Sequence, residues 1–94
     1  MPDIKAILSL QPIAAEWNGC RFQISRPTLA DLVEAVDVNT KSPENARAWC
    51  LHRHCQDMDG KPLFADVADA MAAPAGFAAK VVPQIEALYN EGVD

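Results

Sequence analysis

The dipeptide Asn18-Gly19 constrains the fold of this chain more than any other feature. Both central positions of a type I′ hairpin turn need a positive φ angle, and asparagine followed by glycine is a preferred pair there. A two-residue loop places Trp17 opposite Cys20, and it sets Glu16 and Arg21 as a favourable cross-strand pair. The opposite face is then apolar, with Ile13, Ala15, Trp17, Cys20, Phe22 and Ile24. The sequence therefore predicts a β-hairpin with one face to bury.

A lone hairpin is marginal in water, so it must pack on other elements. Thr28 is a good N-cap, and Asp31 follows it three residues later in a capping-box-like arrangement. The apolar residues behind this cap recur at helical spacing, and we expect their stripe to face the core: Leu29, Leu32, Val33 and Val36. Asn39 and Thr40 close this first helix.

A second helix begins with Ser42 as cap and Pro43 at its first position, and Trp49 and Cys50 lie on its inward face. Asp66 caps a short helix that stops before Pro74. The last segment places its larger apolar side chains on one side: Phe77, Val81, Ile85, Leu88 and Tyr89. Pro83 interrupts it, which predicts either a kink or two short helices that meet near Val82.

The 94 residues are enough for one domain with a single modest core. We predict an α+β fold, mainly α, over residues 1–94, with a β-hairpin or small meander in 1–26 and about four short helices in 28–92. The stretch IKAILSLQ before the hairpin is expected to be a third strand or a loose arm.

The net charge of −5 argues against a nucleic-acid-binding protein, which would normally carry a basic stripe. No apolar stretch is long enough to span a bilayer, and no signal peptide is recognisable at the N-terminus. The three cysteines are an odd number. We therefore expect a cytoplasmic protein with reduced thiols and no membrane partner.

Two cysteines, two histidines and two aspartates crowd the stretch from Cys50 to Gly60, which raises the question of a metal site. Helical spacing scatters the two Cys/His pairs around the axis, so one helix cannot wrap a tetrahedral zinc ion. A three-ligand site made of Cys20, Cys50 and His54 is the remaining metal candidate. The alternative is a core Cys50, with His52 and Arg53 in solvent and His54 beside Cys55 near the helix C-terminus, where the dipole suits a histidine.

A calcium loop centred on Gly60 fails, because Cys55 and Leu63 would occupy ligand positions and the bidentate glutamate is missing. Asp57 and Asp59 are therefore expected to form a turn. Cys50 lacks a strand-to-helix elbow and a Gly-rich loop, and no nucleophile motif or phosphate-binding loop is present. We expect a protein-binding module that is not an enzyme and has no cofactor.

Two separated stretches resemble one family. RFQISRPTLADLVEA is similar to the strand-to-helix step of phage tail assembly chaperones, with Arg26-Pro27-Thr28 followed by Asp31-Leu32. The second half resembles small chaperones of long-tailed phages, in which an acidic turn, a helix, a proline break and a last helix follow one another. These features correspond here to Asp59-Gly60-Lys61-Pro62-Leu63-Phe64, Pro74 and Leu88-Tyr89-Asn90.

The resemblance implies an assembly factor in the bacterial host cytoplasm, encoded by a phage or prophage and absent from the finished virion. Such chaperones bind the helical tape measure protein, keep it soluble and assist tail tube assembly, with the major tail protein as a further partner. We expect Phe77, Val81 and Ile85 to form the contact surface, unless they are core residues. Self-association stays open.

Two other classes remain. One is a small cytosolic regulatory or antitoxin-like interaction module with a dedicated partner. The other is a zinc-binding sensor that uses Cys20, Cys50 and His54.

Overall fold

The N-terminal hairpin forms as the sequence predicts. In the computed structural model, which describes residues 3–4 and 11–90, β1 (Ile13–Trp17) pairs antiparallel with β2 (Cys20–Ile24). The register runs from Trp17 opposite Cys20 to Ile13 opposite Ile24. Asn18 and Gly19 have φ angles of 51° and 81°, the left-handed region that this turn requires.

A third strand, β3 (Cys55–Gln56), completes the sheet in the order β1-β2-β3. It comes from the middle of the chain and follows a helix directly, whereas the sequence had placed Cys55 within that helix. The helix ends here because the backbone carbonyl of His54 accepts a hydrogen bond from Ser25 N, at 2.9 Å, and Cys55 turns extended. Residues 5–10, most of the stretch expected to be a strand or arm, lie outside the described residues.

The helical part of the chain follows the sheet. It consists of α2 (Leu29–Lys41), the 3-10 turn η1 (Pro43–Asn45), α3 (Ala46–His54), α4 (Val67–Met71) and α5 (Ala75–Tyr89). Thr28 and Asp31 form a complete capping box at α2, and Asp66 caps α4. The predicted α+β, mainly α fold is therefore confirmed, and α2 runs one residue beyond its expected end at Thr40.

Pro83 lies inside α5, which continues through it as one helix. The prediction of two short helices meeting near Val82 is therefore wrong. A proline cannot donate to the carbonyl four residues earlier, here that of Ala79. Both Ala79 and Pro83 are exposed, so water can hydrogen-bond to that carbonyl and the helix need not break there.

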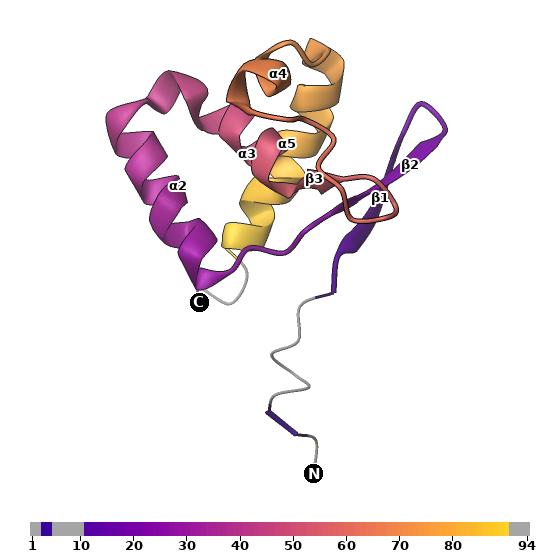
Figure 1. Ribbon diagram of the computed structural model, residues 1–94, viewed down its shortest axis with the longest axis horizontal. Helices are drawn as coiled ribbons and strands as arrows, with labels where there is room; N and C mark the ends of the chain where they lie inside the picture. The colour runs from indigo at the N-terminus through magenta and orange to yellow at the C-terminus, as the bar shows by residue number, and fades with distance from the viewer. Residues whose placement is uncertain (1–2, 5–10, 91–94) are drawn as a thin grey trace.

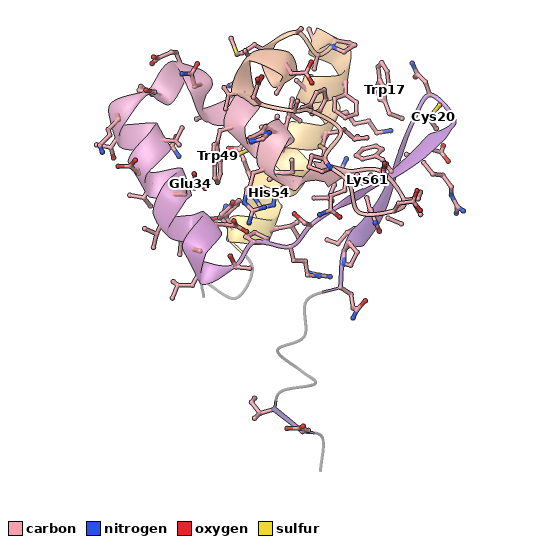
Figure 2. The ribbon with its side chains drawn as sticks, viewed as in Figure 1. Trp17, Cys20, Glu34, Trp49, His54 and Lys61 are labelled. Carbon is pink, nitrogen blue, oxygen red and sulfur yellow. The ribbon has the colours of Figure 1, made fainter. Side chains whose placement is uncertain are left out.

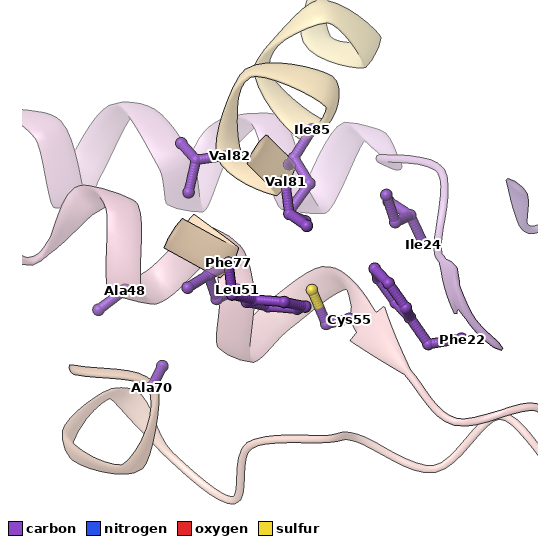
Figure 3. Packing of buried hydrophobic residues seen from close by; sticks show 10 residues of the cluster. All are labelled: Phe22, Ile24, Ala48, Leu51, Cys55, Ala70, Phe77, Val81, Val82 and Ile85. Atoms are coloured by element: carbon purple, nitrogen blue, oxygen red, sulfur yellow. The ribbon is translucent and has the colours of Figure 1, made fainter. Parts of the chain in front are cut away.

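The core lies between the sheet and the last helices, as Figure 3 shows. The sheet contributes Phe22 and Ile24, and the aromatic ring of Phe77 contacts that of Phe22 with 5.5 Å between centroids. The remaining members come from the helices and from β3: Ala48, Leu51, Cys55, Ala70, Phe77, Val81, Val82 and Ile85. The small side chains of Ala48 and Ala70 belong to this core, and α3 packs against both α4 and α5.

The apolar stripe of α2 does not face this core, which corrects the sequence expectation. Leu29, Leu32, Val33 and Val36 are 77%, 44%, 64% and 59% exposed. The buried residue of this helix is Asp31, at 2% exposure. Figure 1 shows the reason for the exposure, since α2 lies on the far side of α3 and α5 from the hairpin, where none of the described elements covers it. We call the four exposed side chains the α2 surface.

Candidate functional site

The α2 surface borders an open groove of about 240 Å³, formed where α2, α3 and α5 meet. Leu32 and Val36 belong to both the surface and the groove. The opposite wall carries Val82 and Tyr89 of α5, and Cys50 of α3 also lines the groove. Exposed apolar patches of this kind, rimmed by polar residues, often mark sites of protein interaction.

The orientation of α2 is set by a polar contact at its first turn. Asp31 accepts a hydrogen bond from Thr28 N at 2.9 Å, and its other carboxylate oxygen lies 2.6 Å from Arg53 Nε of α3. A buried carboxylate must keep such partners, because an unpaired charge away from water is strongly unfavourable. The pair therefore holds the Asp31 side of α2 against the protein and turns the apolar stripe outward.

The groove has little chemical reactivity of its own. Burial, and then the nearby Glu86 carboxylate, raises the pKa of the Cys50 thiol to about 11. A thiol with so high a pKa is protonated near neutral pH and is a poor nucleophile. The charged residues that line the groove are Arg47 and Glu86. The arrangement offers apolar contact with a charged edge, which is suited to binding.

A second polar cluster lies in the interior and surrounds His54, which is fully buried. Its Nδ1 lies 2.9 Å from the carbonyl oxygen of Ser25, which can only accept, so the proton is assigned to Nδ1. Nε2 then accepts from the Tyr89 hydroxyl, at 2.5 Å. Burial lowers the pKa of His54 and outweighs the opposing effect of Asp31, so the neutral ring is favoured. The cluster joins the segment after β2 to α3 and α5. His54 is the last residue of α3, as expected, but burial favours its neutral ring over the cation that would suit the helix dipole.

The structure does not bring the three candidate zinc ligands together. Cys20 lies exposed at the tip of the hairpin, whereas His54 lies inside the helical part, as Figure 2 shows. Cys50 lines the groove, and both ring nitrogens of His54 are already hydrogen-bonded. Within residues 3–4 and 11–90, no group of three or more His, Cys, Asp or Glu side chains could hold a metal ion.

The acidic stretch after α3 folds into a turn, as predicted. Asp57 Oδ1 accepts hydrogen bonds from the backbone N–H groups of Asp59 and Lys61, at 2.9 and 3.0 Å. Gly60 has a φ of 86°, which favours glycine. These contacts direct the Asp57 carboxylate at the backbone, where it closes the loop.

Phe77, Val81 and Ile85 are core residues, at 6%, 1% and 0% exposure. This corrects the expectation that they form a contact surface, since a partner cannot reach them in the folded chain. A core position was the alternative interpretation of these residues, because helical spacing alone does not separate a core stripe from a binding stripe. The exposed apolar surface belongs to α2 instead.

Sequence reasoning missed the two polar clusters. The sequence places Arg53 in solvent, and its side chain is 44% exposed, but the ion pair that it forms with Asp31 joins two different helices and was not predicted. Tyr89 had been grouped with the apolar side chains of its helix, yet its hydroxyl meets His54. The identity of Tyr89 was the one available indication of this hydrogen bond, because a tyrosine hydroxyl usually finds a partner when the side chain is buried.

Comparison of the chain with protein-family models, curated proteins and solved structures found no match. Among the described helices, none combines the length and the apolar character needed to cross a membrane.

Proposed function

We propose that this chain is a tail assembly chaperone of a long-tailed phage or prophage, which binds the tape measure protein and assists tail tube assembly without entering the virion. It would act in the cytoplasm of the bacterial host, without enzymatic activity or cofactor. The resemblance of Arg26-Pro27-Thr28 and of Asp59-Gly60 through Phe64 to that family suggests the client. The α2 surface is the observation that carries the proposal.

A chaperone for a long helical protein must cover apolar stripes that the client will later bury elsewhere. The α2 surface provides an uncovered stripe of the same kind, with Leu32 and Val36 leading into the groove. Amphipathic helices commonly dock their apolar face into such grooves. The net charge of −5 opposes self-aggregation of a protein that exposes this much apolar surface.

Co-expression with the tape measure protein of the same genome tests the proposal. The client is expected to be soluble and to co-purify with the chaperone, whereas it should precipitate when expressed alone or with an unrelated acidic protein of similar size. A tape measure protein that stays insoluble, or that separates from this chain during size-exclusion chromatography, would overturn it.

The regulatory or antitoxin-like alternative predicts a different result. In that case a small protein encoded beside this gene would co-purify in its place, and the tape measure protein would not.

A further inference from the structure

We propose that the groove binds one amphipathic partner helix, seated lengthwise between α2 and α5, whose apolar stripe is flanked by lysine or arginine. The inference rests on the proposed function in one respect: such a helix is the part of a tape measure protein that a chaperone would cover. It goes further by assigning the surface, the shape of the bound segment and its charge.

The form of the groove favours a helix. Its walls are two helices, with Leu32 and Val36 on α2 facing Val82 and Tyr89 on α5. A volume of about 240 Å³ holds the side chains of one helix face but not a whole helix, whose diameter is about 10–12 Å. The partner backbone would therefore lie above the mouth of the groove and insert its apolar side chains.

The length of the surface limits the length of the partner. α2 has 13 residues and so spans about 20 Å at ~1.5 Å per residue. A bound helix of about three to four turns covers that distance, with apolar residues at positions i, i+3, i+4 and i+7. The apolar anchors of α2 occupy its first two turns, from Leu29 at the first residue to Val36 near the middle.

The net charge of the chain favours a basic partner. Asp37 lies exposed beside the stripe on α2, and Glu86 lies exposed across the groove on α5. Lys41 pairs with Asp37 at 3.0 Å, and Arg47 lines the groove at the first turn of α3, so these two basic groups balance the two carboxylates and the acidic excess is that of the whole chain. The whole chain carries −5, and its field attracts a basic segment during association.

The same charges disfavour a second copy of the chain as the occupant. A two-fold interface through the α2 surface would bring together two chains that each carry a net charge of −5. Like charges at an interface oppose binding. A basic helix meets the acidic chain without that penalty.

Designed peptides of about 14 residues provide the probe, each with the same leucine stripe. One carries lysine and arginine beside the stripe, one carries glutamate, and one has the basic composition with the stripe shuffled. Fluorescence anisotropy with the full-length chain is expected to show the basic peptide binding about tenfold tighter than the acidic one at low salt, with a smaller difference at high salt. Equal binding of the two, or binding of the shuffled peptide, would overturn the inference.

Two variants and one matched control locate the contact. Val36→Glu is expected to weaken binding of the basic peptide by about tenfold, because an apolar contact is replaced by a charge. Met71→Glu is the matched control, since Met71 is 60% exposed on α4, away from the groove, and should leave binding unchanged. Glu86→Lys should weaken binding of the basic peptide and strengthen binding of the acidic one, each by a few-fold, as expected for a charge at the edge of an interface. Circular dichroism of each variant verifies the fold, and an equal effect of Val36→Glu and Met71→Glu would refute the site.

The occupant and the client are tested separately. Sedimentation equilibrium that shows a wild-type dimer, dissociated by Val36→Glu, would assign the surface to a second copy and overturn the inference. A tape measure protein that co-purifies equally with wild type and Val36→Glu would leave the chaperone function intact and remove this surface from it. Peptide binding as described, without any binding of the tape measure protein, would leave the helix site intact and overturn the proposed function.

Discussion

Asp31 and Arg53 form an ion pair, with 2.6 Å between carboxylate and guanidinium, that joins the first turn of α2 to the last turn of α3. The same carboxylate completes the capping box with Thr28. One side chain therefore both starts α2 and sets which of its faces is turned to the protein. The exposed apolar stripe is the consequence of that choice.

Asp31→Asn should destabilise the fold, because the amide keeps an acceptor for the cap but loses the charge that Arg53 faces. We expect the free energy of unfolding to fall by about 1–3 kcal/mol, less than for a fully buried pair. The expected loss is smaller because the Arg53 side chain is 44% exposed, and solvent screens the pair. Urea denaturation measures the change.

Asp37→Asn is the control for that substitution. It removes the exposed pair with Lys41 on the same helix, and its effect should stay below about 0.5 kcal/mol. Equal effects of the two variants would show that the Asp31–Arg53 pair does not hold α2 in place.

The buried His54 should make the fold sensitive to acid. Burial lowers its pKa in the folded chain below the ordinary value of 6.5, so the unfolded chain binds the proton more readily. The contribution is complete above pH 6.5 and is lost as the pH falls below that value. The free energy of unfolding should therefore decline from about pH 7 to about pH 5 in the wild type and decline less in His54→Gln. An NMR titration that finds the pKa of His54 at or above 6.5 would contradict this account.

Truncation of an apolar side chain should change the stability of the fold differently in α5 and in α2. Ile85→Ala removes a fully buried side chain of α5 and should destabilise the fold by about 2–5 kcal/mol. Val33→Ala on α2 removes a side chain that is 64% exposed, and it should be neutral or slightly stabilising, by less than about 0.5 kcal/mol, since alanine favours helix. Thermal unfolding of the pair checks the prediction. A large loss with Val33→Ala would place the α2 stripe in the core, as the sequence alone suggested.

Pro83→Ala should stabilise α5, because alanine supplies the N–H group that Ala79's carbonyl lacks. We expect a gain of about 1–2 kcal/mol, smaller than the full helix penalty of proline because the unfolded chain also gains freedom. Pro74→Ala is the control, since Pro74 precedes the first residue of α5, where no such helical bond is restored. A loss of stability in Pro83→Ala, measured by denaturant unfolding, would show that the proline fits a shape that α5 needs.

Local chemistry was enough to predict several elements. The hairpin register followed from Asn18-Gly19, because both residues tolerate the positive φ angles that a two-residue loop demands. The capping box at Thr28 and the cap at Asp66 followed in the same way, since a side-chain acceptor at a helix start meets unpaired N–H groups nearby in sequence. The turn at Asp57 also depends only on neighbours within four residues.

The candidate site could not be predicted in this manner. Helical periodicity identified the stripe with Leu32 and Val36 but could not say whether the core or solvent would meet it. Phe77, Val81 and Ile85 showed the same period and became core. The strand at Cys55 was missed because its pairing partner, β2, lies far away in the chain.

Local sequence is sufficient to specify the turns, caps and helix-forming segments of this protein, because each depends on backbone preferences and contacts within a few residues. The tertiary structure alone decided which apolar face is buried. That choice depends on the ion pair between Asp31 and Arg53 and on the hydrogen bond between His54 and Tyr89. Both form only when α2, α3 and α5 pack together. The exposed α2 surface results from that packing.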